Sequence, residues 1–379
     1  MHRAFGWLHL HEPQVRRWQM EFLAVAAPTF HEGARARWFV ERFAELGLVG
    51  ARLDGAGNAV AELVGSISGG PVVLVSAHLD TVFGLEVDVT PREEGAVIYG
   101  PGACDNGAGL AALLALAAAL KHAEIVPGAT VVFAANVGEE GEGDLRGMRH
   151  LFSAESEYFQ RIGTVIALEG SGTGTVVDRA LGSRRLRVTV NGPGGHSWAD
   201  AGVGNPIFAL AGALAAVARV RLSGNPRTTL SAGTLSGGTS INSIPASASA
   251  GLDIRSTSGL ELDRTEMAVL QVLEKELKGF GPELTFHVER IGDRPSGELA
   301  AGSALALSLR AVDRHLGVAT DARIGSTDAN VPLALGVQAV AIGCGGVSGG
   351  IHTLGEWFDP SGRELALRRV LLLVMDACG

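Results

Sequence analysis

Four short apolar segments constrain the fold of this chain more than any other feature of its sequence. Each is nearly continuous in apolar character and ends in glycine or polar residues: 71–80 (PVVLVSAHLD), 130–140 (TVVFAANVGEE), 163–170 (GTVIALEG) and 337–346 (VQAVAIGCGG). Strands covered by helices on both faces have this character, whereas strands with one wet face alternate. Helical stretches lie between the segments. The pattern therefore predicts an α/β fold with a mostly parallel, mixed sheet flanked by helices.

One of these helices is expected within 27–47 (APTFHEGARARWFVERFAELG). Thr29 and Glu32 have the spacing of a capping box, in which each side chain satisfies a free backbone N–H of the first turn. Gly47 is expected to end the helix. The prediction is thus a helix that starts at Thr29.

The segment 184–291 differs from the rest because apolar and polar residues alternate in its first and last strands, 184–192 and 283–290. Alternation indicates one covered and one wet face. With helices near 205–220 and 259–278, the order is β-α-β-β-α-β, a ferredoxin-like unit. We expect it to be inserted into a single domain formed by 1–183 and 292–379. An exposed edge of its sheet would invite pairing with a second copy, giving a homodimer.

The composition excludes several classes of protein. The net charge is −9 and no basic run occurs, so nucleic acid is not an expected partner. The longest apolar stretch, 109–120, is too short to span a membrane, and the start of the chain lacks the apolar segment of a signal peptide. Three cysteines without CxxC spacing indicate a reducing compartment, and we expect a cytoplasmic protein.

Acidic or imidazole residues lie at the ends of the first three apolar segments, and His352 lies in the loop after the fourth. Ligand sites of open α/β sheets lie outside the carboxyl ends of the strands, so these side chains can share one crevice. Asp105, at the start of the apolar helix, would face it as well. The set comprises His78, Asp80, Glu139, Glu140, Glu169 and His352 in addition to Asp105.

So many carboxylates in one crevice would repel one another unless cations compensate them. Imidazole and carboxylate ligands without a thiolate fit two divalent ions, zinc first, with cobalt or manganese as alternatives. Taken singly, each motif has a plainer interpretation. A histidine at a strand end is usually a core or loop residue, and GEEGEGD is most simply a solvated acidic turn. The glycine-rich loop 100–109 lacks the lysine of a phosphate-binding loop.

In these motifs the sequence resembles the di-zinc metallopeptidase family that includes aminoacylase, acetylornithine deacetylase, succinyl-diaminopimelate desuccinylase, glutamate carboxypeptidase and the tripeptidases. The resemblance runs in order over nearly the whole chain. It is carried by SAHLDTV, GPGACDNGAG, EEGEGDLRG, LEGSG, NGPGGHSW, GGTSINSIP, GLDIRS, GSTDAN and GGIHTLGEW.

The resemblance implies a role for each metal ligand. His78 and Glu169 would hold one ion, Glu140 and His352 the other, and Asp105 would bridge both, often through a cis peptide in this family. The residue types by themselves indicate a set of ligands but do not assign each ligand to one of the two ions.

Two further carboxylates have implied roles that are not ligation. Asp80 would accept the second N–H of His78 and so fix its tautomer. Glu139 would be the general base that takes a proton from the water between the metals and passes it to the leaving amine.

The inserted domain would supply the remaining groups and act as a lid. His196 in NGPGGHSW would donate to the oxyanion, from the partner subunit in family dimers; a plain loop histidine is the alternative. Asn242 and Arg255 resemble the clamp of a substrate carboxylate or oxyanion, although Arg255 could also be a surface strand residue. No role is assigned to Asp328 or Asn330, and Glu356 could either support the site or be structural.

The expected function is hydrolysis of a peptide or N-acyl amide bond of a small substrate. At the position of Glu169 the tripeptidase branch more often has aspartate. Glutamate here therefore favours deacylase or carboxypeptidase-like members of the family. The alternatives are a lidless type of di-zinc aminopeptidase, which the inserted domain disfavours, and a catalytically silent metal- or peptide-binding protein. The choice among these substrates is expected to depend on details of the pocket.

Overall fold

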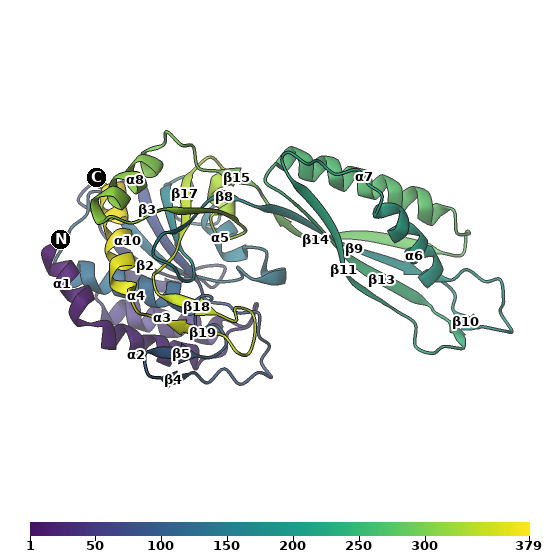
Figure 1. The fold of residues 1–379 in the computed structure, drawn as a ribbon, viewed down its shortest axis with the longest axis horizontal. Coiled ribbons are helices and arrows are strands. Elements are labelled where there is room, and N and C mark those ends of the chain that lie inside the picture. The colour runs from purple at the N-terminus through teal and green to yellow at the C-terminus, as the bar shows by residue number, and fades with distance from the viewer. The chain divides into compact units, whose positions relative to one another are not determined.

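The structure, a computed structural model, describes all 379 residues and divides into two compact units. The first comprises Met1–Ala180 and Glu298–Gly379, and the second comprises Leu181–Gly297. Figure 1 labels many of the elements of both.

A mixed sheet forms the centre of the first unit. Its neighbouring strands are, in order, β1 (Val49–Leu53), β2 (Ala59–Leu63), β6 (Val131–Asn136), β3 (Val72–His78), β7 (Ile162–Leu168), β17 (Gln338–Ile342), β8 (Thr175–Ala180) and β15 (Gly297–Glu298), and β16 (Asp321–Gly325) pairs with β8. The central pairs β6–β3, β3–β7 and β7–β17 are parallel, whereas β1–β2, β2–β6 and β17–β8 are antiparallel. The predicted mostly parallel, mixed sheet is confirmed.

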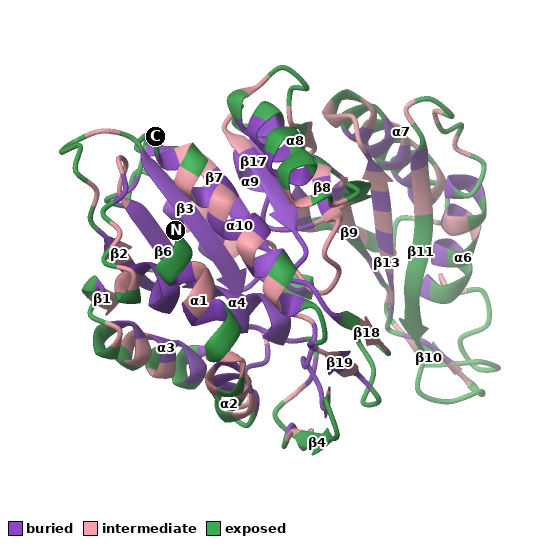
Figure 2. Ribbon diagram, turned by 60° about the vertical axis from the view of Figure 1, so that its left-hand side comes forward, coloured by how far each residue is buried: buried purple, intermediate pink, exposed green.

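The sheet is covered on both faces because successive residues of its strands enter two different cores. In β3, Val73 and Val75 belong to the core that also contains α1 (His2–Leu10), α2 (Glu12–Leu23), α3 (Gly33–Glu45), α4 (Gly107–His122), α8 (Ala304–Leu316) and α10 (Arg363–Cys378). Val72 and Leu74 belong to the other core, with α5 (Arg146–Leu151) and α9 (Asn330–Ala334). Figure 2 shows β3, β6 and much of α4 as buried. None of the helices is both long and apolar enough to cross a membrane.

A small second sheet of this unit joins distant parts of the chain. Its order is β18 (Val347–Gly349), β19 (Trp357–Asp359), β5 (Val97–Tyr99) and β4 (Arg92–Glu94). The loop from 350 to 356 connects β18 with β19, so this sheet fixes both ends of the segment that carries His352.

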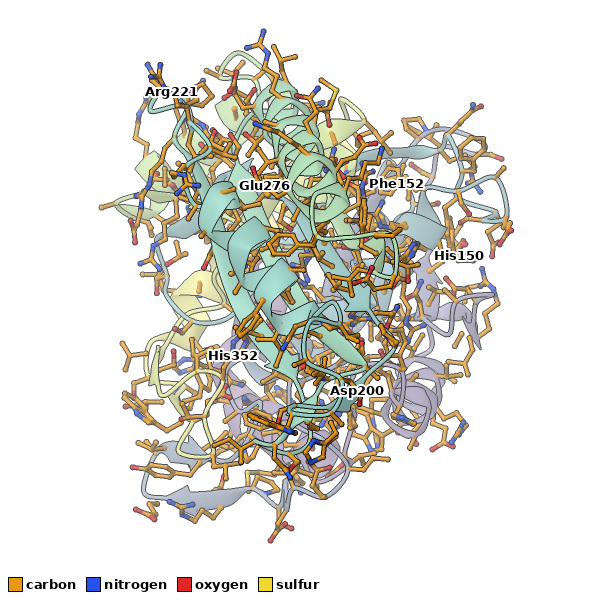
Figure 3. The ribbon with its side chains drawn as sticks, turned by 90° about the vertical axis from the view of Figure 1, so that its right-hand side faces the viewer. His150, Phe152, Asp200, Arg221, Glu276 and His352 are labelled. Carbon is orange, nitrogen blue, oxygen red and sulfur yellow. The ribbon has the colours of Figure 1, made fainter.

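The second unit has the ferredoxin-like order that the alternating strands predict. The elements are β9 (Gly182–Asn191), α6 (Pro206–Val217), β11 (Thr228–Gly237), β13 (Ser247–Ser256), α7 (Gly259–Lys278) and β14 (Thr285–Arg294), with a short extra pair of β10 (Gly195–His196) and β12 (Ser243–Ile244). The sheet order is β11-β13-β9-β14 and all pairs are antiparallel. Leu186 and Val188 of β9 are buried with residues of both helices. In Figure 3, α6 and α7, the helix of Glu276, lie in front of these strands.

The predicted start of α3 is wrong. The helix begins at Gly33, and its N-cap, Glu32, makes no capping hydrogen bond through its side chain. The Thr29 hydroxyl instead donates to Asp80 Oδ2 at 2.9 Å, so a charged acceptor distant in sequence takes the group that the capping box would use. The end of the helix is as predicted, because Gly47 follows the C-cap with a φ of 73°, in the left-handed region that favours glycine.

Candidate metal centre

Five of the predicted site residues lie at or just beyond the carboxyl ends of strands of the central sheet. His78 is the last residue of β3, and Asp80 follows it two residues later. Glu139 and Glu140 come shortly after β6, and Glu169 comes directly after β7. Since β3, β6 and β7 are parallel neighbours, their carboxyl ends lie side by side.

Asp105 and His352 reach the same place from loops. Asp105 precedes Asn106, the N-cap of α4, and the peptide bond between them is cis. The Asn106 amide donates to the carbonyl oxygen of Leu168 at 2.9 Å, which ties the start of α4 to the end of β7. His352 lies between β18 and β19, and its backbone has a φ of 63°.

These side chains form two adjoining groups that share Asp105. His78 Nε2 lies 3.0 Å from Asp105 Oδ1 and 3.7 Å from Glu169 Oε1. His352 Nε2 lies 3.0 Å from Asp105 Oδ2 and 3.0 Å from Glu140 Oε1. In each group the possible ligand atoms lie within 4.8 Å of one another, and those of His78, Glu139 and Glu140 form a third such group. Each oxygen of the Asp105 carboxylate thus faces a different group.

The buried carboxylates and imidazoles of the site shift one another's pKa values in opposite directions. Burial and the nearby carboxylates raise the pKa of Glu140 and of Glu169 to about 7. Burial alone would also raise the pKa of Asp105, but hydrogen bonds from the two histidines hold it well below its usual value. The hydrogen bond to Asp105 raises the pKa of His352 to about 9. Divalent cations bound here would take the place of the protons on these carboxylates and relieve the repulsion between the carboxylates.

The donor atoms also fit such cations in kind. Two imidazole nitrogens and three carboxylates are a ligand set for zinc and related first-row ions, in two neighbouring sites. Cys104 is adjacent in sequence, but burial raises the pKa of its thiol to about 12, so it does not offer a thiolate.

Asp80 holds the turn that carries the two adjacent glutamates. Its Oδ1 accepts the backbone N–H of Glu139 and its Oδ2 accepts that of Glu140, both at 2.9 Å. His78 Nδ1 lies 3.0 Å from the backbone carbonyl oxygen of Asp80 and 3.6 Å from its Oδ1. The shortest contacts of the Asp80 carboxylate are therefore to the turn and to Thr29, while its carbonyl is the nearer partner of the imidazole.

Glu356 supports the loop of Asp105, a role that the sequence left open. This carboxylate is 1% exposed and accepts three backbone N–H groups. Oε1 accepts those of Cys104 and Asp105 at 2.8 Å each, and Oε2 accepts that of Gly102 at 2.9 Å. Its place four residues after His352 was the only signal in the sequence.

Asp328 lies in the buried layer beside β6. Asn136, at the end of β6, donates from Nδ2 to Asp328 Oδ2 at 2.8 Å, and both side chains are fully buried or nearly so. Burial, followed by the charge of Glu139, raises the pKa of Asp328 to about 8. Sequence reasoning assigned this residue no role.

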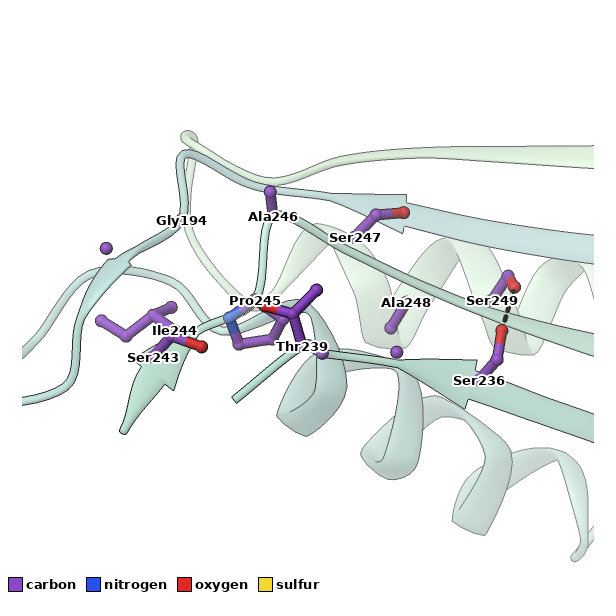
Figure 4. A pocket seen from close by; sticks show the side chains of 13 residues that line it. Gly194, Ser236, Thr239, Ser243, Ile244, Pro245, Ala246, Ser247, Ala248 and Ser249 are labelled. Atoms are coloured by element: carbon purple, nitrogen blue, oxygen red, sulfur yellow. Dashed lines mark hydrogen bonds between the residues drawn. The ribbon is translucent and has the colours of Figure 1, made fainter. Parts of the chain in front are cut away.

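His196 and Asn242 meet at one end of the second unit. His196 Nδ1 accepts the backbone N–H of Trp198 at 3.1 Å and that of Ala199 at 3.3 Å, so the neutral imidazole carries its proton on Nε2 and can donate there. The backbone carbonyl of Asn242 accepts the N–H of Ser197 at 3.1 Å. A hollow of about 630 Å³ lies nearby, lined by 194–195, 236–239 and 243–249 (Figure 4).

Arg255 does not join these two residues within the unit. It lies near the other end of β13 from Ser247, a separation of about 26 Å for eight residues at roughly 3.3 Å each. Its Nε donates to Asp253 Oδ2 at 2.6 Å. One copy of this unit thus keeps Arg255 apart from the end where His196 and Asn242 lie.

Comparisons with known proteins agree with this fold. The chain matches the model of "Peptidase family M20/M25/M40" over residues 74–376. A search of curated proteins gave no match.

Several solved structures are similar in fold. A tripeptidase from Staphylococcus aureus has 23% identity and a TM-score of 0.78, covering 96% of this chain and 98% of that one. An aminopeptidase PepT from Bacillus cereus has 22% identity and a TM-score of 0.75, with 96% and 98% covered. Human carnosine dipeptidase 1 has 15% identity and a TM-score of 0.76, with 100% and 99% covered. Since the family model covers most of the chain, this protein belongs to peptidase family M20/M25/M40.

Proposed function

We propose that this peptidase uses two zinc ions to hydrolyse a peptide bond, or a related N-acyl amide bond, of a small substrate. The observation that carries the proposal is the shared Asp105: its two carboxylate oxygens face two different groups of ligand atoms. A carboxylate placed in this way could be shared by two ions. A similar structure is described as a dinuclear metal-binding peptidase of the M20 family from Bacillus subtilis.

In the proposed site, His78 and Glu169 would hold one ion, Glu140 and His352 would hold the other, and Asp105 would be shared. When bound, such ions polarise the scissile carbonyl and lower the pKa of water. Asp80 and Glu356 are positioning residues, because they fix the backbone of the ligand-bearing loops by 2.8–2.9 Å hydrogen bonds.

Glu139 is proposed as the general base. It is 5% exposed and its backbone N–H is fixed by Asp80, so its side chain starts from a defined position. The next residue, Glu140, has its carboxylate at His352. In the proposed reaction, Glu139 accepts a proton from the attacking water and transfers it to the amine as the C–N bond breaks, which yields a carboxylic acid and an amine.

The second unit is proposed to act as lid and dimerisation domain. Its edge strand β11 has mostly exposed residues, and such an edge can pair with a second copy. The separation of Arg255 from His196 and Asn242 supports a shared site, because two copies can supply the groups that one copy keeps apart. His196 would then donate to the oxyanion from the partner, and Arg255 and Asn242 would bind the substrate carboxylate.

The test combines metal content with a substrate panel. The purified protein is expected to hold two zinc equivalents and to cleave some dipeptides, tripeptides or N-acetyl amino acids. Cobalt or manganese in place of zinc would change the metal but not the reaction. A protein that holds two ions and leaves every such substrate intact would contradict the proposal and favour a silent binding protein. The cytoplasmic location stays a prediction from the sequence.

A further inference from the structure

One fully buried arginine lies against the end of β3 and is not among the candidate metal ligands. Arg35 belongs to the first turn of α3 and is 1% exposed. A cation in this turn lies at the positive end of the helix dipole, which is locally unfavourable. Burial of a guanidinium is also unfavourable unless hydrogen bonds and an opposite charge compensate it. The contacts of Arg35 show what compensates it here.

The hydrogen bonds of Arg35 join two segments of the first unit. Nε and Nη2 donate to the carbonyl oxygen of Val25 at 3.0 and 2.6 Å, and Nη1 donates to that of Leu79 at 2.8 Å. Val25 follows α2. Leu79 comes directly after β3, between His78 and Asp80. The guanidinium thus fixes the backbone immediately before Asp80 to the segment that leads into α3.

Further contacts run along the same two segments. Thr81 donates its backbone N–H to the carbonyl of Ala27 at 3.0 Å, and the Thr29 hydroxyl donates to Asp80 Oδ2 at 2.9 Å. Asp80 in turn accepts the backbone N–H groups of the two adjacent glutamates. A continuous set of hydrogen bonds therefore leads from Arg35 to the turn that carries a proposed ligand and the proposed base.

The charge of Arg35 is opposed by that of Asp80. The hydrogen bonds of the guanidinium all go to backbone carbonyls, so they leave its charge without a carboxylate in direct contact. Burial lowers the pKa of Arg35 to about 10, and the charge of Asp80 opposes this shift, so the guanidinium stays protonated at neutral pH. Asp80 is itself 0% exposed. Two buried charges of opposite sign thus lie on this side of the site.

In the proposed function, on which this inference rests, the charge of Asp80 has no counterpart among the metals. Two divalent ions would balance the carboxylates proposed as ligands or as base, namely Asp105, Glu139, Glu140 and Glu169. Asp80 is buried beside them without being a proposed ligand. A buried charge left without an opposite charge is strongly destabilising. Arg35 supplies that opposite charge without occupying a position on either ion.

We propose that Arg35 is a positioning residue of the metal centre, which holds Asp80 in place through the Leu79 carbonyl and through its opposite charge. Asp80 then presents Glu139 and Glu140 from a fixed turn. A displacement of this turn would move a ligand and the base together. The chemical step should therefore suffer more than substrate binding when Arg35 is replaced.

A double-mutant cycle tests the pair in the metal-free protein. Arg35→Gln and Asp80→Asn each remove one charge and keep a polar side chain. Urea unfolding is followed by tryptophan fluorescence, since every tryptophan except Trp198 lies in the first unit. Each single variant should raise the unfolding equilibrium constant. The double variant should raise it at least about 5-fold less than the product of the two single changes.

A second measurement concerns the centre itself. In Arg35→Gln the visible absorption spectrum of the cobalt-loaded protein should differ from that of the wild type, because the ligand geometry changes. Its kcat should fall about 10- to 100-fold, with KM changed less than about 3-fold. Arg35→Lys keeps the cation and should lose less than about 5-fold in kcat. A larger loss in a folded Arg35→Lys would overturn the role of the charge, whether or not Arg35→Gln folds.

Arg369→Gln is the matched control. Arg369 is another fully buried arginine of the first unit, and it binds both carboxylate oxygens of Asp313 and the carbonyl oxygen of Thr173. Its replacement should destabilise the protein but leave the cobalt spectrum and kcat nearly unchanged. Its effect on unfolding should also multiply with that of Asp80→Asn. If Arg35→Gln behaves in the same way, Arg35 only stabilises the fold and the proposal is overturned.

The outcomes separate the role of Arg35 from the proposed function. Independent effects in the cycle, or an unchanged cobalt spectrum and kcat in Arg35→Gln, would overturn the positioning role while the wild type remains an active peptidase. A wild type that holds two ions and cleaves no peptide or N-acyl amino acid would overturn the proposed function. The cycle and the cobalt spectrum would then still decide whether Arg35 positions Asp80, because neither depends on turnover.

Discussion

Glu356 Oε1 accepts the backbone N–H of Asp105 at 2.8 Å from a position 251 residues later in the chain. This bond fixes the residue that both groups of ligands share. It also binds the C-terminal part of the first unit to the loop before α4. The consequence for metal binding can be measured.

Glu356→Ala is expected to weaken zinc binding by about 10- to 100-fold, as for other residues that orient metal ligands. The three N–H groups that it leaves without this acceptor should also lower the melting temperature. Glu356→Gln keeps one acceptor oxygen and should have the smaller effect. Competition with a zinc chelator measures the affinity. Unchanged affinity in Glu356→Ala would show that the loop holds its form without this carboxylate.

Glu139→Ala and Glu140→Ala separate the two adjacent glutamates. Glu139→Ala should keep both metals and lose about 10²-fold or more in kcat, because the proposed general base is removed. Glu140→Ala should lose metal, because its carboxylate is one of the atoms grouped with Asp105 and His352. Elemental analysis of both variants, together with kcat, is the measurement. Metal loss in Glu139→Ala but not in Glu140→Ala would reverse the two assignments.

Mixing two inactive variants tests the shared site. His196→Ala and Glu139→Ala are each expected to be nearly inactive alone. In a mixture that exchanges subunits, half of the dimers are mixed and each has one intact site, so activity should return in about a quarter of the sites. Sedimentation verifies the dimer. If activity fails to return although mixed dimers form, His196 does not act from the partner.

The stability of the metal-free protein should depend on pH through Asp328. Its pKa is raised from 3.8 to about 8, so the folded state holds this proton more tightly than the unfolded state. The stabilisation is complete below about pH 4 and is lost as the pH rises towards 8, by up to about 1.4 kcal/mol per pH unit for one proton. Asp328→Asn lacks this group and should lose less stability between pH 5 and pH 8. Urea unfolding in the presence of a chelator compares the two, and parallel curves would contradict the assignment.

Most strands of the central sheet, and the site residues at their carboxyl ends, could be predicted from the sequence. His78, Glu140 and Glu169 could be placed because parallel strands bring their carboxyl ends together, which depends only on strand order. The ferredoxin-like unit was visible in the same way, from alternation in β9 and β14.

Side-chain partners that depend on packing were not predictable. Thr29 has the spacing of a helix cap, but Asp80 takes its hydroxyl once β3 lies beside the loop. Glu356 looked ambiguous because its three N–H partners are about 250 residues away. A pocket of about 310 Å³ is lined by three loops, 28–30, 81–84 and 140–142, and no local sequence pattern shows that these loops meet.

The bonds of Asp80 limit how this enzyme can be altered. One carboxylate fixes the backbone of both Glu139 and Glu140, and its carbonyl faces His78. A substitution there would disturb the proposed base and ligands of both ions at once. Efforts to exchange the metal or to change the acid–base step should therefore keep Asp80 fixed.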